Sequence, residues 1–232
     1  MEPPTGVFAD RGRVVIKDVL DTAVAEKIHS CLMGPVPWRL AFRDARYEGP
    51  RRERRVPVSE IAKLSPEEMS ALRRQIYAQT RHSGQYLYES YNLKAGREAG
   101  EAPGLYAYKF LDFLESDCFL RFIRELTRNT EVNRLFAFAA RYTAGSYHSV
   151  HVDVDEYDDR RYAFVFGFTR AWCADMGGLL HFLDEDGNVT ESVVPAFNTL
   201  TLFTVPAHHS VSMVSPWVTG QRLTVTGWLL VK

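Results

Sequence analysis

The feature that most restricts the fold is a series of short apolar segments in the C-terminal part of the chain. Eight segments rich in β-branched and aromatic residues follow one another there, separated by Gly, Pro, Asn and Asp. They lie at 135–142, 146–154, 161–169, 178–183, 189–194, 198–205, 209–214 and 222–231. Parallel strands need long crossover connections, which are usually helical, and no helical segment separates these runs. They therefore predict an antiparallel, closed sandwich of the jelly-roll type.

The residues before 135 have the pattern of helices. A short strand is predicted at 14–16, and amphipathic helices are predicted after the N-cap residues Asp21, Ser65 and Ser116. The helix after Ser65 has the spacing of a capping box and a proline at its first position. Later in the chain, Asp186-Gly187 is expected to form a hairpin turn.

Together these segments predict an α+β protein with one domain over residues 1–232. Residues 1–134 are expected to form a mostly helical annex that supports a jelly-roll core at 135–232. Two stretches rich in Gly and charged residues, 48–55 and 94–104, are expected to be mobile loops.

The charges nearly cancel, since 28 Lys and Arg oppose 29 Asp and Glu and give a net charge of −1. Nucleic-acid-binding domains normally carry an excess of Lys and Arg, so the expected partner is a small molecule, a peptide or a protein and not a nucleic acid. The three cysteines are far apart in sequence and form neither a disulfide framework nor a zinc-site spacing. With no signal peptide and no membrane segment evident, we expect a cytoplasmic protein. Its oligomeric state has no signal in the sequence.

The segment 142–153 contains the first candidate metal ligands. Residues two apart on a strand share a face, so His151 and Asp153 are expected to point the same way and Val152 the other way. A third candidate lies on a later strand, where His209 is expected to point inward and His208 outward. Two imidazoles and one carboxylate can occupy one face of an octahedral metal, an arrangement typical of non-haem Fe(II) oxygenases.

The last predicted strand contains a candidate anion site. Arg222 and Thr224 share a face of this strand, and an inward guanidinium beside a hydroxyl is suited to bind a carboxylate. One dicarboxylic acid could then contact the metal at one end and Arg222 at the other. A structural ion pair between Arg222 and a carboxylate of the barrel is the alternative.

The chain resembles the Fe(II)/2-oxoglutarate-dependent dioxygenases of the prolyl 4-hydroxylase-like branch, over about residues 135–231. The matching positions are Tyr142, Gly145, His151, Asp153, Trp172, Gly177, Gly178, Leu179, Pro206, His209, Ser210, Val211, Arg222, Thr224, Gly227 and Trp228. The resemblance implies a double-stranded β-helix, with iron on His151, Asp153 and His209 and 2-oxoglutarate held by Arg222. It further implies O2 as cosubstrate, ascorbate as an auxiliary reductant, and hydroxylation of an unactivated C–H bond with decarboxylation of 2-oxoglutarate to succinate.

The strand before Trp172 departs from the family pattern at two positions, a tyrosine and an asparagine soon after it, because this sequence reads Phe166-Gly167-Phe168-Thr169 there. Many of these hydroxylases have a tyrosine that helps to hold the distal carboxylate of the cosubstrate, and this sequence has Gly167 there. Arg222 and Thr224, with Tyr142, are then expected to hold that carboxylate. Tyr147 and the two loops are the candidates for substrate contact. The expected substrate is an amino-acid residue, prolyl or other, in a peptide or protein, or a free amino acid.

Other interpretations of the same residues stay open at this point. The triad could be a hydrogen-bonded polar cluster, and Tyr142 and Tyr147 could simply fill the core. His148 and His181 are expected to be packed or half-exposed and not metal ligands. A zinc or cupin-like metalloenzyme could use the same triad, because zinc accepts three protein ligands and a water. A catalytically silent jelly-roll binding module is the third alternative.

Overall fold

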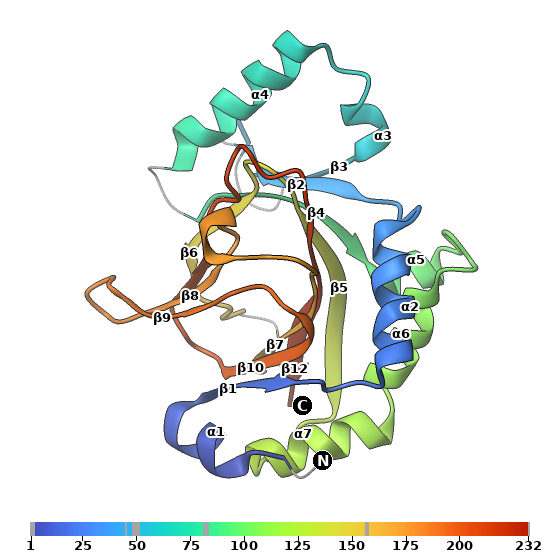
Figure 1. The fold of residues 1–232 in the computed structure, drawn as a ribbon, viewed down its shortest axis with the longest axis vertical. Coiled ribbons are helices and arrows are strands. Elements are labelled where there is room, and N and C mark those ends of the chain that lie inside the picture. Colours follow the sequence, from blue (N-terminus) through green and yellow to red (C-terminus); the bar gives the residue numbers. More distant parts are fainter. Residues whose placement is uncertain (1–2, 45, 48–51, 81–83, 156–157, 232) are drawn as a thin grey trace.

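The computed structural model describes residues 3–44, 46–47, 52–80, 84–155 and 158–231. Their strands form one curled sheet in which every pairing is antiparallel (Figure 1). The strands are β1 (Arg13–Lys17), β2 (Arg39–Arg43), β3 (Glu53–Pro57), β4 (Tyr86–Asn92), β5 (Arg134–Tyr142), β6 (Tyr147–His151), β7 (Arg160–Phe168), β8 (Leu180–Leu183), β9 (Val189–Val193), β10 (Phe197–Thr204), β11 (His209–Val211) and β12 (Arg222–Leu230). The predicted α+β jelly-roll architecture is thus confirmed.

All eight strands predicted after residue 135 are present, as β5 to β12, and so is the short strand near 14–16, as β1. Asp186 and Gly187 lie in the turn between β8 and β9, where the Gly187 N–H donates to the carbonyl of Asp184. The sheet order is β1-β10-β7-β12-β5-β4-β6-β11-β8-β9, with β2 and β3 attached beside β4.

Three strands in the N-terminal part were not predicted, namely β2, β3 and β4. The β4 strand lies between β5 and β6, so the N-terminal part contributes directly to the sheet that carries the site. The sequence of β4 lacks a polar and apolar alternation because five of its seven residues are buried and these lie on both faces. A strand that is buried on both faces has no alternation of polar and apolar residues, so this pattern cannot identify it in the sequence.

The predictions of mobile loops at 48–55 and 94–104 are both partly wrong. Residues 53–55 belong to β3, which pairs with β2, whereas 48–51 lie outside the described residues. Residues 94–98 belong to a helix, α5 (Leu93–Glu98), whose N-cap is Asn92. The Asn92 side chain accepts a hydrogen bond from the Ala95 N–H, so a local cap starts a helix that the Gly-rich sequence did not suggest.

The three predicted helices begin at their predicted caps. These are α2 (Thr22–Met33) after Asp21, α4 (Pro66–Gln79) after Ser65 with its complete capping box, and α7 (Asp117–Thr127) after Ser116. The other helices are α1 (Thr5–Arg11), α3 (Val58–Ile61) and α6 (Tyr106–Leu114), with a short 3-10 turn at Ala174–Met176. Figure 1 shows α2 and α6 along one side of the sheet, α1 and α7 at one end and α4 at the other. No helix among the described residues has both the length and the apolar character needed to cross a membrane.

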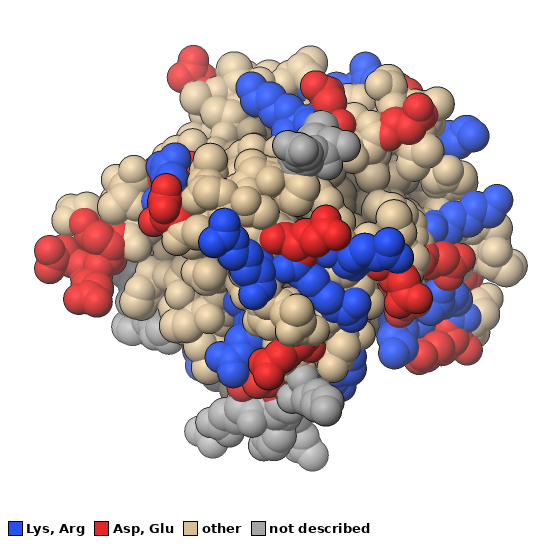
Figure 2. All heavy atoms as spheres, turned by 90° about the horizontal axis from the view of Figure 1, so that it is seen from below, with Lys and Arg blue, Asp and Glu red and all other residues tan. Residues whose placement is uncertain are grey.

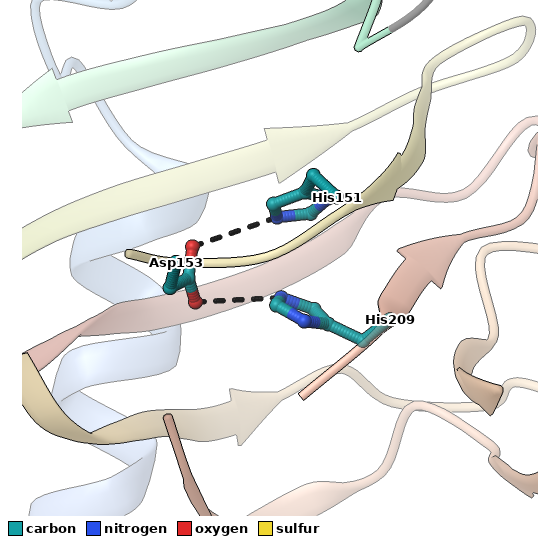
Figure 3. A group of neighbouring side chains, drawn as sticks. All are labelled: His151, Asp153 and His209. Carbon is teal, nitrogen blue, oxygen red and sulfur yellow. Dashed lines mark ion pairs between the residues drawn. The ribbon is translucent and has the colours of Figure 1, made fainter. Parts of the chain in front are cut away.

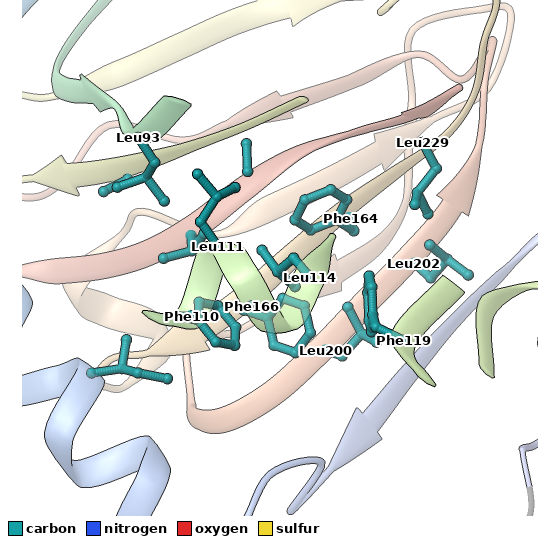
Figure 4. Packing of buried hydrophobic residues seen from close by; sticks show 14 of the residues in the cluster. Leu93, Phe110, Leu111, Leu114, Phe119, Phe164, Phe166, Leu200, Leu202 and Leu229 are labelled. Carbon is teal, nitrogen blue, oxygen red and sulfur yellow. The ribbon is translucent and has the colours of Figure 1, made fainter. Parts of the chain in front are cut away.

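The main core lies between the helices and one face of β7, β10 and β12 (Figure 4). It contains Phe110, Leu111 and Leu114 from α6, Phe119 from α7, Phe164 and Phe166 from β7, Leu200 and Leu202 from β10, and Leu229 from β12. Because strand residues alternate, the opposite face of the same three strands turns toward the inside of the curled sheet. The helices therefore cover one face and leave the other face to form a cavity.

Charged side chains do not separate into one basic and one acidic surface on the face drawn in Figure 2. Blue Lys and Arg atoms lie directly beside red Asp and Glu atoms across the centre of that face. This mixture agrees with the near-zero net charge of the sequence.

Phe166→Ala tests the helix-covered core. The Phe166 side chain is 1% exposed and contacts the rings of Phe110 and Phe119, so we expect the free energy of unfolding to fall by about 3–5 kcal/mol. Urea unfolding followed by circular dichroism measures it. Trp217→Ala, at a side chain that is 60% exposed, is the control and is expected to change it by less than about 0.5 kcal/mol. Equal effects of the two variants would contradict this assignment of the core.

Candidate functional site

The three predicted metal ligands lie close together where β6 ends and its partner β11 begins. His151 is the last residue of β6 and His209 the first residue of β11, and the two are opposite each other in the β6–β11 pairing. Asp153 follows two residues after His151. Its Oδ1 lies 3.6 Å from Nε2 of His151 and its Oδ2 lies 3.4 Å from Nε2 of His209 (Figure 3). One ligand atom from each of the three residues lies within 4.8 Å of the others.

Hydrogen bonds fix both imidazole rings in the orientation that a metal ligand needs. Nδ1 of His151 lies 2.9 Å from the carbonyl of Ser149, and Nδ1 of His209 lies 2.9 Å from the carbonyl of Ala207. A carbonyl only accepts, so Nδ1 carries the proton in both rings and donates it to the backbone. The lone pair of each imidazole is then on Nε2, the atom that faces Asp153.

The electrostatics of the triad favour neutral imidazole. Burial, together with the neighbouring His209, lowers the pKa of His151 to about 4, although Asp153 opposes this shift. Near pH 7 the contact between His151 and Asp153 is therefore not an ion pair. The arrangement is instead a set of two imidazole nitrogens and one carboxylate that converge on one point, which fits a divalent cation.

A second charged group faces the same cavity without a carboxylate partner. Arg222, the first residue of β12, is 4% exposed and lies over the ring of Tyr142, with 4.6 Å between the guanidinium carbon and the ring centroid. No carboxylate of the described residues pairs with it, and its Nε has no hydrogen-bond partner among them. Burial lowers the pKa of Arg222. The structural ion pair considered for Arg222 is thus not found in the described part of the chain, and the buried cation calls for an anionic ligand.

Threonine hydroxyls surround the side of Arg222 that faces β7 and β10. Thr224 was predicted there, and the structure adds Thr199 and Thr201 from β10, which line the same small space. All three are less than 9% exposed. The space adjoins Gly167, where an added Cβ would lie 2.4 Å from the carbonyl oxygen of Ala196 and 2.5 Å from the Thr199 hydroxyl. This position therefore excludes a side chain, and hydroxyls of β10 stand next to the place where the family tyrosine would be.

Stacked rings connect the arginine to the metal ligands. Tyr142, beside Arg222, stacks on Tyr88 with 4.9 Å between centroids and an interplanar angle of 8°. Tyr88 stacks on His148 at 5.7 Å, and His148 stacks on His151 at 3.7 Å and 12°. The prediction that His148 is a packed residue and not a ligand agrees with this position. The sequence analysis did not identify Tyr88 at all, because it lies on the unpredicted strand β4.

The structure does not bring Tyr147 to the site. Its side chain is 5% exposed, packs with Ile76 and Tyr77, and forms a hydrogen bond with the Thr80 hydroxyl, so it lines neither the cavity nor the groove described next. The reason is a bulge in the β6–β11 pairing between His148 and His151. A bulge adds one residue to the strand and reverses the faces beyond it, so His148 points inward in place of Tyr147.

The cavity between the metal ligands and Arg222 has a volume of about 100 Å³. It adjoins a wider groove of about 750 Å³ on the surface. Six residues line both spaces, namely Tyr88, Phe138, His148, His151, Asp153 and Trp228. Parts of the two segments expected to contact substrate also line the groove: Glu53 and Arg55 from one, and Ala95, Gly96, Ala99 and Glu101 from the other.

Comparison with known proteins agrees with this geometry. Residues 137–230 match the 2OG-Fe(II) oxygenase superfamily. In fold, the chain is similar to a Pseudomonas putida prolyl-4-hydroxylase, with 17% identity, a TM-score of 0.58, and coverage of 98% of this chain and 97% of the other. It is also similar to a Trichoplax adhaerens prolyl hydroxylase in complex with a hypoxia inducible factor oxygen degradation domain peptide fragment, with 16% identity, a TM-score of 0.62, and coverage of 98% and 87%. A Burkholderia pseudomallei oxidoreductase of the 2OG-Fe(II) oxygenase family shares 12% identity and a TM-score of 0.60, with coverage of 97% and 88%.

Asp153→Ala tests the metal site. Asp153 supplies the only negative charge of the triad, so we expect Mn(II), used as a redox-silent divalent cation, to bind this variant at least about 100-fold more weakly than the wild type. Calorimetric titration of the metal-free protein measures the affinity. Asp186→Ala, on the exposed turn between β8 and β9, is the matched control and should bind like the wild type. An affinity of Asp153→Ala for Mn(II) within threefold of that of the wild type would refute the assignment of Asp153 as a metal ligand.

Acid is expected to destabilise the metal-free protein. Burial keeps the pKa of His148 well below the usual 6.5 and that of His151 at about 4, so between these values the unfolded chain binds more protons than the folded chain. The free energy of unfolding should therefore fall as the pH is lowered from about 6.5 toward 4, by on the order of 1 kcal/mol per pH unit for each histidine. Urea unfolding at pH 7, 6 and 5 measures this slope, and His148→Phe should reduce it. A free energy of unfolding that stays constant from pH 7 to pH 5 would contradict this prediction.

Proposed function

We propose, on the premise that residues 137–230 match the 2OG-Fe(II) oxygenase superfamily, that the protein hydroxylates a C–H bond of an amino-acid residue in a peptide or protein. The enzyme class is that of 2-oxoglutarate-dependent non-haem iron dioxygenases, with Fe(II), 2-oxoglutarate and O2 as cofactor and cosubstrates. The observation that carries the proposal is the buried Arg222, which has no carboxylate partner among the described residues and lines the same cavity as the His151, Asp153 and His209 triad.

The residues present fit both groups. His151, Asp153 and His209 would hold the iron, because their donor atoms converge and both imidazoles are held in the Nε2-donor form. Arg222, with hydroxyls at Thr224, Thr199 and Thr201, would bind the distal carboxylate of 2-oxoglutarate. When bound, iron and 2-oxoglutarate would supply the oxidising chemistry, in which the substrate C–H bond, O2 and 2-oxoglutarate yield the hydroxylated substrate, succinate and CO2.

The protein contributes orientation and exclusion of water. Tyr142 is fully buried under the Arg222 guanidinium, and burial raises its pKa to about 12, so its hydroxyl stays protonated and neutral beside the carboxylate site. Phe138 and Trp228 line both the cavity and the groove, which places apolar rings where a substrate side chain would pass toward the iron. Such rings shield a reactive centre from water and other reactions.

The groove supports a peptide or protein substrate. It continues from the metal ligands across β4 to β2 and β3, and polar and charged side chains line it along its length. A similar fold in the Trichoplax adhaerens enzyme holds a peptide fragment. The expectation of a reducing, cytoplasmic location also stays part of this proposal, and the three free cysteines support it.

The zinc or cupin-like metalloenzyme and the silent binding module explain less of the structure. Either could keep the triad, but neither gives a reason to bury the guanidinium of Arg222 in the same cavity with no carboxylate partner from the described ranges. A dicarboxylic cosubstrate does give that reason.

Arg222→Gln tests the proposal. The substitution removes the charge that binds the distal carboxylate, so we expect the KM for 2-oxoglutarate to rise about 100-fold or more, or succinate formation to be lost. Succinate released with Fe(II) and O2 is the measurement. Arg170→Gln, at an exposed arginine paired with Glu26, should behave like the wild type.

The free energy of unfolding distinguishes a loss of 2-oxoglutarate binding in Arg222→Gln from a loss of folding. Because Arg222→Gln removes a buried charge that has no carboxylate partner among the described residues, the free energy of unfolding of the ligand-free variant should equal or exceed that of the wild type. Wild-type kinetics in Arg222→Gln would overturn the proposal, as would a wild type that binds no 2-oxoglutarate.

A further inference from the structure

The arginines of the groove differ in how their charges are balanced. Three of the four pair with carboxylates that also line the groove: Arg39 with Glu101 at 3.2 Å, Arg43 with Glu53 at 3.7 Å, and Arg160 with Asp155 at 2.7 Å and Asp158 at 3.7 Å. The fourth, Arg55, forms no ion pair with any carboxylate of the described residues. The charge of Arg55 is therefore not balanced by a direct ion pair, although the groove as a whole is lined by five carboxylates and four arginines.

The guanidinium of Arg55 is held over the inner face of the sheet. In the register of the strands Arg55 of β3 is opposite Ala41 of β2, and Ala41 is opposite Tyr88 of β4. The small, fully buried Ala41 leaves space for the arginine to cross toward β4, where its Nη1 donates a hydrogen bond of 3.0 Å to the hydroxyl of the buried Ser90. Arg55 lies close enough to Tyr86 and Tyr88 for its positive charge to oppose the rise in the pKa of both.

Two further polar groups lie between Arg55 and the metal ligands. Tyr88 and His148 line both the groove and the cavity, and neither side chain has a hydrogen-bond partner among the described residues. Burial holds the pKa of Tyr88 well above its usual 10, so its hydroxyl remains a hydrogen-bond donor at any physiological pH. A guanidinium and a hydroxyl donor, both with free hydrogen-bonding capacity, thus border the path into the cavity.

We propose that Arg55 and the Tyr88 hydroxyl form a carboxylate-binding subsite in the groove, and hence that the substrate carries an acidic group beside the residue that is hydroxylated. A carboxylate accepts the fork of guanidinium N–H groups and a hydroxyl at once, which suits the chemistry of this pair. The inference rests on the proposed function, because it describes the substrate of the same site. The carboxylate has two sources in principle, the side chain of Asp or Glu in a peptide and the α-carboxylate of a free amino acid.

Matched pairs of probes test the subsite. The full-length protein is loaded with Mn(II) and 2-oxoglutarate under argon, and calorimetry measures the binding of capped prolyl tripeptides with Glu or Gln at either neighbour of proline. A second arm compares free proline with prolinamide. We expect the acidic member of at least one pair to bind the wild type about tenfold more tightly, and the arm in which this occurs identifies the source of the carboxylate.

Two variants and a control assign the preference to the subsite. Arg55→Gln should reduce the acidic preference to within about twofold, and Tyr88→Phe should reduce it in part. Arg54→Gln is the matched control, because Arg54 is the next residue of β3, points to the other face and lies over the ring of Tyr47, away from the groove. It should keep the full preference.

The outcomes of these titrations distinguish the carboxylate subsite from the proposed function on which it rests. No acidic preference in either arm for the wild type, or a preference that survives in Arg55→Gln, overturns the subsite. The same titration series includes 2-oxoglutarate alone with the Mn(II)-loaded wild type. Binding of 2-oxoglutarate without an acidic preference refutes only the subsite, whereas failure to bind 2-oxoglutarate refutes the proposed function itself.

Discussion

Arg222 is buried inside the sheet, and the described part of the chain gives it no carboxylate partner. Such a position is unfavourable, so the surrounding strand must hold the side chain in place. In β12 the alternation of the strand does so. Leu223 and Val225 are fully buried in the core between helices and sheet, which forces Arg222 and Thr224 onto the cavity face. The apolar packing on one side of β12 thus supplies the energy that keeps a charged, partly unsatisfied group on the other. The same alternation in β10 turns Leu200 and Leu202 to the helices, and Thr199 and Thr201 to the small space beside Arg222.

A column of packed rings connects Arg222, at one end of the cavity, to the metal ligand His151 at the other end. The guanidinium of Arg222 lies on Tyr142, and the stack continues through Tyr88 and His148 to His151. Interiors are packed closely enough that a ring cannot tilt without displacing its neighbour. The orientation of the imidazole of His151 is therefore set twice, by its own hydrogen bond to Ser149 and by this column of rings. Two of the four rings come from strands other than β6, so the position of a metal ligand depends on β4 and β5 as well.

The parts of the site that the sequence predicted are those that depend on local alternation. His151, Asp153 and His209 could be assigned by counting in steps of two, and so could the inward direction of Arg222 and Thr224. The structure places Tyr147 away from the site because a bulge reverses the inward direction within β6, and no residue type marks that bulge in the sequence. Tyr88, Thr199 and Thr201 join the site only through pairings between distant strands. The strand that carries Tyr88 is buried on both faces and so lacks the alternation by which a strand is recognised.

The charges of the cavity explain why metal and cosubstrate belong together there. Without ligands, the carboxylate of Asp153 and the guanidinium of Arg222 carry opposite charges, but both line the same cavity without forming an ion pair with each other. A divalent cation alone would leave an excess of positive charge in this space, and a dicarboxylate alone an excess of negative charge; both are costly where the surroundings are poorly polarisable. Together the two ligands restore neutrality and also place a counter-charge next to each fixed group. Each ligand therefore makes the binding of the other more favourable, and by linkage the effect on the two affinities is equal.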